Sequence, residues 1–324
     1  MKKYPIHKDL RLLWFLRPVL WPPLMPFLNA LRGLAPYPFS GEVNAARHAI
    51  RVKPGQTIPA LVISPLHIAT PAPCLVYFHG GAFMLKAARH HHRLAEELAI
   101  QAPCVVVVPD YRLAPRHPFP VPADDCYQSY HWVVRNATSL GVDPKRLAVG
   151  GDSAGGALAA ATCLMARDRE FELPCFQLLL YPVTSRKMDS GSMKQFKRAP
   201  VWNAAQNRQM WKWYLPKRDA AHIEYASPLE APAFAGLPPA YIEVAQLDPL
   251  RDQGEAFADA LQDAGVLARL VRVTGAVHGF DLMKNSGLVS ECIKLRALAL
   301  RNAFYGDGKE NSSENEANVP VGHL

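Results

Sequence analysis

A serine flanked by glycines, in the stretch Gly151-Asp152-Ser153-Ala154-Gly155, is the part of this sequence best suited to covalent chemistry. The apolar run "RLAV" precedes it and the alanine-rich run "GALAAA" follows it, so the expected order is strand, tight turn and helix. This order is typical of a nucleophile elbow, which exposes the serine hydroxyl at a helix N-terminus, where developing negative charge is favoured. A P-loop is excluded because no Gly-Lys-Ser/Thr follows. We therefore predict that Ser153 is a nucleophile that attacks an acyl carbon.

A serine nucleophile needs a base, and the sequence offers two candidate histidines. His79, Asp110 and Ser153 follow the chain order of chymotrypsin-like proteases, but those proteins are all-β, and here a long helical pattern follows the serine. In an α/β hydrolase the order is serine, acid and histidine. His278 comes directly after the last strand pattern, which places it at the same edge of the sheet as the serine. We predict that His278 is the base and that His79 braces its own loop.

The acid that orients the base is expected between these two residues in the chain. Asp248 follows the strand pattern at 240–245 and should therefore emerge at the same edge of the sheet. Asp252 lies four residues further on, where the helix has already begun, and is the second choice. We predict that Asp248 fixes the tautomer of the imidazole and stabilises its charged form.

The stretch "YFHGGAF" at 77–83 combines a strand end with two glycines. An acyl-transfer site needs N–H donors aimed at the developing oxyanion. Gly80 and Gly81 can turn their N–H groups inward because no side chain blocks them, and Ala154, the residue after the serine, supplies another donor. We predict that Gly80, Gly81 and Ala154 form the oxyanion hole.

Side chains that contact the substrate are expected around these residues. Tyr181 follows a strand pattern and is expected at the floor of the pocket. Trp211 and Tyr214 belong to a tryptophan-containing segment and either line the pocket or form a small core of that segment. With Phe83 and Asp152, they complete the predicted substrate-binding set.

The scaffold for these residues is predicted from alternating strand and helix patterns that begin at about residue 58. The run "CVVVVPDY" is apolar at consecutive positions, as expected for a strand buried on both faces. The alternation predicts an α/β fold with a mostly parallel, twisted sheet flanked by helices on both faces. We assign residues 46–185 and 227–305 to this catalytic domain.

Two further segments lack strand patterns and are predicted to form a helical cap, or lid. Residues 186–226 are basic and contain three tryptophans. Residues 1–45 are apolar, but prolines interrupt their longest uncharged run, and a membrane span needs about 20 apolar residues. We expect short helical pieces there that pack on the protein or on a membrane surface. Residues 306–324 are polar and are predicted to be disordered.

Composition sets further expectations about partners and compartment. The chain has 324 residues, 49% hydrophobic residues and a net charge of +8, and its six cysteines form no close pairs. We therefore expect free thiols in the cytoplasm, and neither a disulfide framework nor a metal site. The histidines at 90–92 are consecutive and point in different directions on a helix, which disfavours a shared metal. We expect no cofactor, no nucleic acid, at most weak membrane-surface contact, and a possible homodimer through residues 285–304.

Five motifs resemble those of the hormone-sensitive-lipase-like family of α/β-hydrolase esterases, in the order and spacing of that family. They are "HGGAF" at 79–83, "DYRLAPRHPFPVPADD" at 110–125, "GDSAGG" at 151–156, "DPLRDQGEAFADAL" at 248–261 and "HGF" at 278–280. Two positions depart from the family pattern. Ala82 stands at the third glycine of HGGG, and Arg116 stands where the family usually has Glu.

The resemblance implies an α/β-hydrolase fold with a helical cap and the triad and oxyanion donors named above. It implies a serine carboxylesterase that hydrolyses short- to medium-chain acyl esters through an acyl-enzyme intermediate. A lipase, lactonase or amidase would use the same site. A non-catalytic ligand receptor on the same fold is a further alternative, but receptors of this lineage lack the histidine, and His278 is present.

Overall fold

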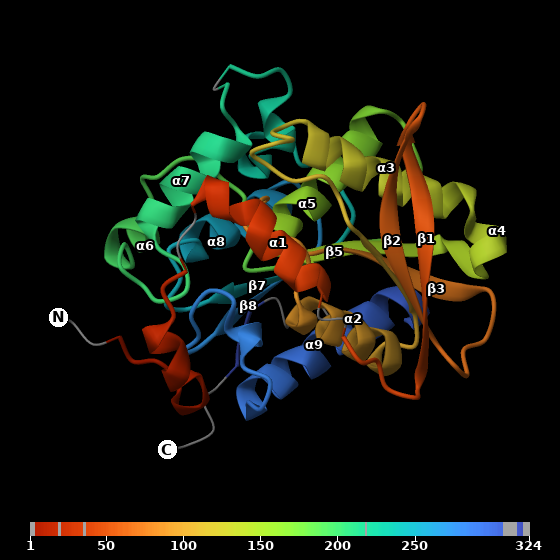
Figure 1. Ribbon diagram of the computed structural model, residues 1–324, viewed down its shortest axis with the longest axis horizontal. Coiled ribbons are helices and arrows are strands. Elements are labelled where there is room, and N and C mark those ends of the chain that lie inside the picture. Colours follow the sequence, from red (N-terminus) through yellow and green to blue (C-terminus); the bar gives the residue numbers. More distant parts are fainter. Residues whose placement is uncertain (1–3, 19–20, 35–36, 218, 307–315, 320–324) are drawn as a thin grey trace.

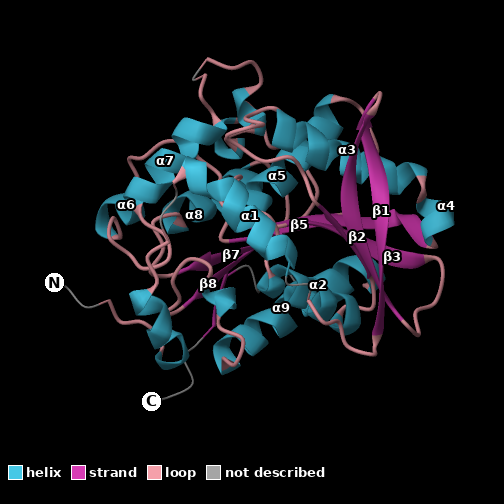
Figure 2. Ribbon diagram, in the orientation of Figure 1, coloured by secondary structure: helices cyan, strands magenta, loops and turns pink. Residues whose placement is uncertain are grey.

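One mixed sheet forms the centre of the molecule in the computed structural model, which describes residues 4–18, 21–34, 37–217, 219–306 and 316–319. The strand order is β1-β2-β4-β3-β5-β6-β7-β8-β9. Figure 2 shows the strands in magenta between the helices. β2 pairs antiparallel with β1 and with β4, and all other neighbours are parallel. The bounds are β1 Val43–Lys53, β2 Gln56–Pro65, β3 Ala72–Phe78, β4 Val105–Pro109, β5 Val142–Asp152, β6 Phe176–Leu180, β7 Ala240–Ala245, β8 Ala268–Val273 and β9 Glu316–Val319.

Helices cover both faces of this sheet, which confirms the predicted α/β architecture (Figure 1). Val105 and Val107 of β4 belong to one buried core cluster, whereas Val106 and Val108 belong to the other. The continuous valine run therefore serves both cores, because successive strand residues point to opposite faces. The first core contains α3 (Val121–Arg135), α5 (Ala154–Asp168) and α8 (Arg251–Asp263), and the second contains α2 (Arg89–Gln101) and α9 (Gly287–Tyr305).

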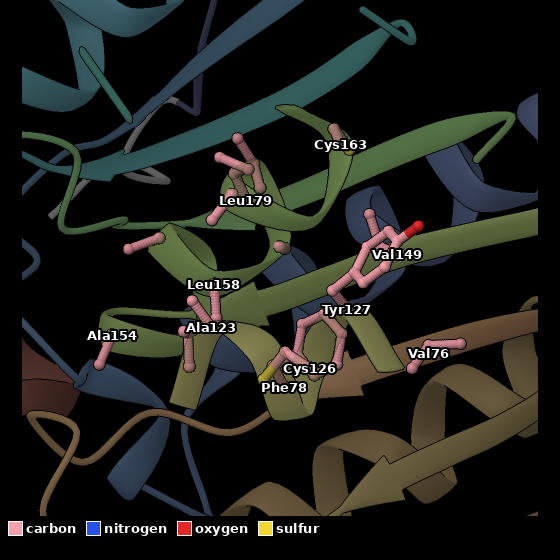
Figure 3. Packing of buried hydrophobic residues seen from close by; sticks show 14 of the residues in the cluster. Val76, Phe78, Ala123, Cys126, Tyr127, Val149, Ala154, Leu158, Cys163 and Leu179 are labelled. Atoms are coloured by element: carbon pink, nitrogen blue, oxygen red, sulfur yellow. The ribbon is translucent and has the colours of Figure 1, made fainter. Parts of the chain in front are cut away.

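The close packing of the first core brings β3 and β5 under the helix that follows the serine. Figure 3 shows Val76 and Phe78 of β3 and Val149 of β5 near Leu158 of α5. α3 and the short α4 (Ala137–Leu140) complete this side of the domain. The arrangement fixes the end of β5, where the nucleophile lies, between two layers of buried side chains.

The sequence patterns did not reveal β1. Within its eleven residues only Val43, Ile50 and Val52 are buried, so no regular apolar alternation marks it. The cap boundary predicted at residue 45 is therefore wrong by a few residues, because β1 begins at Val43.

The C-terminal segment also differs from the prediction in part. Of residues 306–324 the structure describes residue 306 and Glu316–Val319, and the latter form β9, parallel to β8. The prediction of disorder is thus wrong for these four residues. The edge of β8 would otherwise leave a row of backbone N–H and C=O groups unpaired, and a short extended segment satisfies them whatever its composition.

The two segments predicted to form the cap are in contact with each other. The mid-chain segment forms α6 (Gly191–Gln195), α7 (Ala204–Tyr214) and η3 (Ile223–Tyr225), with η4 (Pro228–Glu230) just after it. The N-terminal segment forms η1 (Lys8–Phe15), η2 (Pro22–Leu24) and α1 (Met25–Leu34). The N–H of Val201 donates to the carbonyl of Leu16 over 2.9 Å, and the rings of Tyr4 and Phe196 meet edge to face at 5.6 Å.

Candidate active site

Ser153 lies in the tight turn between β5 and α5, with a backbone φ of 55° and ψ of −117°. This conformation is unfavourable for a residue with a side chain, so its surroundings must hold it. The N–H of Ser153 donates to the carbonyl of Leu180 over 2.8 Å. A Cβ atom on Gly155 would lie 1.8 Å from the carbonyl oxygen of Phe78, so only glycine lets α5 approach β3. These features are those of the predicted nucleophile elbow.

The structure brings Ser153, His278 and Asp248 together at one edge of the sheet. His278 Nε2 lies 2.8 Å from Ser153 Oγ, and His278 Nδ1 lies 2.6 Å from Asp248 Oδ2. Asp248 is fully buried, and its other carboxylate oxygen accepts a hydrogen bond from the N–H of Leu250 over 2.9 Å. The three side chains follow β5, β7 and β8, whose carboxyl ends meet at this edge.

Asp252, the second choice for the acid, lies away from the histidine. Its Oδ2 accepts a hydrogen bond from the N–H of Ser192 over 2.6 Å, and its Oδ1 accepts one from Arg251 Nε over 2.9 Å. Burial raises the pKa of the Asp252 carboxyl, but these hydrogen bonds lower the pKa by more. Asp252 therefore connects α8 to the cap helix α6.

The backbone of the loop after β3 corrects one of the predicted oxyanion donors. The N–H of Gly80 donates to Asp152 Oδ1 over 2.8 Å and so does not point to the serine side. Gly81 has a φ of 121° and Ala82 a φ of 58°. The N–H groups of Gly81, Ala82 and Ala154 have no hydrogen-bond acceptor within the described part of the protein. Gly80 is thus replaced by Ala82 as a candidate donor.

Asp152, predicted to contact the substrate, instead anchors this loop from below. It accepts hydrogen bonds from Gly80 and from the Tyr77 hydroxyl, the latter over 2.7 Å, and His91 Nε2 lies 3.3 Å from its other oxygen. Burial raises the pKa of Asp152, but the interactions with His91 and Tyr77 lower the pKa well below its usual range. Because both carboxylate oxygens have partners inside the protein, the prediction of substrate contact is wrong.

Comparison with known proteins identifies the family. The family described as the alpha/beta hydrolase fold matches residues 75–282, a range that holds the serine, the acid and the histidine. Esterase LipI of Mycobacterium tuberculosis is 32% identical over 316 residues, which cover 90% of this chain and 97% of LipI. The chain belongs to the hormone-sensitive-lipase-like α/β hydrolases. Carboxylesterase NlhH of the same organism is 39% identical over 226 residues, which cover 69% of this chain and 71% of NlhH.

Solved structures agree with this assignment along nearly the whole chain. A bacterial heroin esterase superimposes with a TM-score of 0.85 at 32% identity, covering 93% of this chain and 98% of that protein. An ester hydrolase from the metagenome of Lake Arreo was solved with a derivative of bipyridine phosphonate. It superimposes with a TM-score of 0.83 at 34% identity, covering 92% of this chain and 99% of that protein. The protein is a carboxylic ester hydrolase, as the motifs predicted.

His79 is a structural residue in this hydrolase, as predicted. It is fully buried, its ring stacks on Tyr111 with centroids 4.4 Å apart, and its Nδ1 lies 2.8 Å from the carbonyl oxygen of Gly80. The Tyr111 hydroxyl donates to the carbonyl of His79 over 2.6 Å. Burial and the neighbouring His91 lower the pKa of His79 to about 4, so its ring is neutral near pH 7. The ring braces the oxyanion loop.

His91, the middle one of three consecutive histidines at the start of α2, has a structural role. The N–H of Ala88 donates to His91 Nδ1 over 2.9 Å, so the ring caps the helix, and its Nε2 faces Asp152. In the ranges that the structure describes, no group of three or more His, Cys, Asp or Glu side chains is placed to hold a metal ion. Those ranges also contain no helix with the length and apolar character needed to cross a bilayer.

Tyr181, predicted at the pocket floor, lies behind the catalytic histidine. Its ring meets His278 edge to face at 5.1 Å, and its hydroxyl donates to Asp281 Oδ2 over 2.6 Å. Arg296 Nη1 donates to Asp281 Oδ1 over 2.8 Å, and Arg296 Nε donates to Glu243 over 3.0 Å. Tyr181 therefore supports His278 from inside the protein, and the prediction of substrate contact is wrong.

The charged members of this network were missed at the sequence level. A signal exists, because Glu243 interrupts the apolar strand "AYIEVA" and Arg296 lies among apolar residues of α9. Two opposite charges in buried patterns indicate a buried pair. Burial raises the pKa of Glu243, and the opposing effect of Arg296 does not fully offset it.

The cap meets the oxyanion loop through aromatic side chains. Phe83 and Tyr214 stack with centroids 3.6 Å apart, and both are fully buried, so they form part of a small core rather than an open pocket wall. The ring centroid of Trp211 lies 6.4 Å from that of Phe83, and Trp211 lines a cavity of about 790 Å³ in the cap. Trp202, outside the predicted site set, has its ring 5.7 Å from that of His278.

Proposed function

We propose that Ser153, His278 and Asp248 hydrolyse esters through an acyl-enzyme intermediate. The observation that carries this proposal is the unbroken series of contacts from Ser153 Oγ to His278 Nε2 and from His278 Nδ1 to Asp248 Oδ2. Ser153 Oγ attacks the ester carbonyl carbon while His278 Nε2 accepts the hydroxyl proton. The tetrahedral intermediate collapses, and His278 returns the proton to the departing alkoxide. A water molecule then releases the acid by the same route, which regenerates Ser153.

Asp248 orients the base in this scheme. Its buried carboxylate accepts a hydrogen bond from Nδ1–H of His278, which leaves Nε2 free to take the serine proton. The N–H of Leu250 holds the second oxygen of Asp248, so the carboxylate cannot rotate away from the imidazole. The same charge stabilises the imidazolium that forms during each step.

Three backbone N–H groups are proposed to stabilise the oxyanion: those of Gly81, Ala82 and Ala154. Their lack of acceptors inside the described protein supports this role, and Ala154 adds the N-terminal dipole of α5. Asp152 holds Gly80 and thereby sets the direction of the next two N–H groups.

Substrate size is proposed to be set by the cap, formed by residues 1–42 and 186–226. The aromatic contacts of Trp202 and Trp211 next to His278 and the oxyanion loop support short- to medium-chain acyl esters as substrates. Lipase, lactonase and amidase activities would use the same triad, and the experiment below separates the lipase from the short-chain esterase. We retain three predictions about partners and compartment: no nucleic-acid partner, a homodimer that pairs an edge strand or a helix near residues 285–304, and a cytoplasmic location, which the six free cysteines favour.

The test is a series of p-nitrophenyl esters from acetate to palmitate, assayed with the wild type and with Ser153→Ala. We expect the highest kcat/KM on short or medium chains and a loss of about 10⁴-fold or more in the variant, because the nucleophile is removed. The matched control is Ser139→Ala, an exposed serine whose hydroxyl bonds only its own turn. Activity that survives in Ser153→Ala would disprove the mechanism, and a preference for palmitate would favour a lipase.

A further inference from the structure

The helix α1 carries apolar side chains on its inner and outer faces. On the inner side Met25 is buried and Asn29 Nδ2 donates to the carbonyl of Met84 over 3.0 Å. On the outer side Phe27 and Leu31, four residues apart and therefore on one face, are 60% and 46% exposed. A helix with apolar side chains on two opposite faces is expected to be covered on both. Within the part of one chain that the structure describes, Phe27 and Leu31 on the outer face stay exposed.

The same pattern continues through the rest of the N-terminal segment. Leu10 and Leu13 of η1 are buried, whereas Leu12 and Phe15 are exposed, the latter by 80%. The described residues expose twelve large apolar side chains, and six of them lie within this short segment. We call these six the N-terminal apolar surface: Leu12, Phe15, Leu16, Trp21, Phe27 and Leu31. Such a concentration marks an interaction site, since scattered apolar residues would be ordinary.

The charged side chains of the N-terminal segment itself are almost all positive. Residues 4–34 contain Lys8, Arg11, Arg17 and Arg32, the last of which donates to the carbonyl of Lys86, but only one acid, Asp9. Asp9 faces inward, where its carboxylate accepts hydrogen bonds from the Ser286 hydroxyl and from the backbone of α9. Basic side chains next to exposed aromatic and aliphatic ones are typical of segments that lie in the interface of an anionic bilayer.

We propose that the N-terminal apolar surface binds the protein to the surface of bilayers that contain anionic lipids. No helix of the described residues spans a bilayer, so the contact is peripheral. A second copy of the chain would cover this surface less well. In a two-fold dimer the same patch meets itself, so the basic residues of the two copies would face each other without acids to pair them.

The location of this surface connects it to the candidate active site. α1 bonds to the loop that follows the oxyanion donors, through Met84 and through the N–H of Lys86, which donates to Asn29 Oδ1 over 2.9 Å. The carbonyl of Leu16 accepts from Val201, whose neighbour Trp202 lies against His278. Resting on the proposed function, this placement adds a substrate class: short- to medium-chain acyl esters of apolar alcohols, which partition into a bilayer and reach the site from the membrane side of the cap.

Vesicle sedimentation tests the proposal with the full chain. The probes are phosphatidylcholine vesicles and vesicles of phosphatidylcholine mixed with phosphatidylglycerol. We expect binding to the mixed vesicles, weaker binding to the neutral ones, and release at high salt. The double variant Phe15→Ser/Phe27→Ser should weaken partitioning by about tenfold or more, because each ring contributes apolar area to the bilayer contact. Lys8→Gln/Arg11→Gln should weaken it by about fivefold per charge.

The matched control is Leu267→Ser, a leucine 59% exposed and located outside the N-terminal segment, which should bind vesicles like the wild type. Hydrolysis of p-nitrophenyl butyrate in solution, measured on every variant, reports folding and the proposed function separately from binding. Absence of vesicle binding by an active wild type would overturn the membrane proposal and leave the esterase mechanism intact. The proposal would also be overturned if Leu267→Ser weakened vesicle binding as much as Phe15→Ser/Phe27→Ser does. A third contrary outcome is a wild type that binds no vesicles but forms a dimer that Phe27→Ser dissociates.

Discussion

The carboxyl edge of the sheet and the cap differ in how many of their buried polar groups have hydrogen-bond partners. At the sheet edge, Asp152, Asp248 and Asp281 each have both carboxylate oxygens paired inside the protein. Nine buried side-chain nitrogen or oxygen atoms of the described residues lack a hydrogen-bond partner. Five of these nine lie in α7 and the turn before it. They belong to Trp202, Gln206, Asn207, Trp211 and Trp213.

This difference separates the two tasks of the enzyme. The paired carboxylates fix the serine, the histidine and the oxyanion loop, and a reacting geometry must be held to within a fraction of an ångström. The indole N–H groups of the cap are not tied to one arrangement by hydrogen bonds inside the protein, so the cap can adjust to different acyl chains. We infer that catalytic power resides at the sheet edge and substrate choice in the cap.

The largest effect on the sheet edge is expected from Arg296→Met. Removal of the guanidinium leaves Glu243 and Asp281 as neighbouring buried carboxyls, and breaking a buried ion pair in this way costs about 3–5 kcal/mol of unfolding free energy. The deficit should shrink toward acidic pH, because burial raises the pKa of Glu243 in the folded state, and a carboxyl left without Arg296 is better tolerated when it is protonated. Urea unfolding monitored at neutral pH and at about pH 5 measures both effects.

Arg301→Met is the control, since Arg301 is an exposed residue on the same helix. We expect it to change the free energy of unfolding by about 0.5 kcal/mol or less. A loss no greater in Arg296→Met than in Arg301→Met would show that the buried network does not hold the histidine side of the site.

A smaller effect is expected from Asp152→Asn. The amide oxygen can still accept from Gly80, but the charge that pairs with His91 is lost, so we expect a deficit of about 2 kcal/mol at neutral pH and a fall in kcat/KM of about tenfold. The pKa of Asp152 is lowered on folding, so its carboxylate stabilises the protein above its unfolded pKa of about 3.9, and this contribution is lost as the pH falls below that value.

The free energies of unfolding of Asp152→Asn and the wild type should therefore become equal at acidic pH. Asp143→Asn is the control, because Asp143 is a partly exposed carboxylate paired with Arg146. A surface ion pair of this kind contributes about 1 kcal/mol or less to the free energy of unfolding. A constant difference between Asp152→Asn and the wild type from neutral to acidic pH would contradict the stabilising role of the Asp152 carboxylate.

The sequence identified those residues whose placement follows from chain order alone. Ser153, Asp248 and His278 each follow a strand that points to one sheet edge, so their meeting is a consequence of topology. Gly80 and Asp152 were assigned wrongly, because their hydrogen bond joins positions 72 residues apart and depends on how the loop folds back. Tyr181 was assigned wrongly because its direction depends on a positive φ of 34° that no local pattern marks.

The smallest effect is expected in the cap, from Trp211→Phe. The indole N–H makes no hydrogen bond within the described protein, so its removal costs little stability, while the smaller ring enlarges the cap cavity that Trp211 lines. We expect kcat on acetate to stay within about twofold and the octanoate-to-acetate ratio of kcat/KM to change by about 1 kcal/mol, or roughly fivefold. Trp132→Phe, on α3 and outside the cap, should leave this ratio unchanged. If Trp211→Phe instead lowers kcat on both esters equally, Trp211 acts through the oxyanion loop, and the division between a fixed catalytic edge and a selective cap fails at the stacked rings of Phe83 and Tyr214.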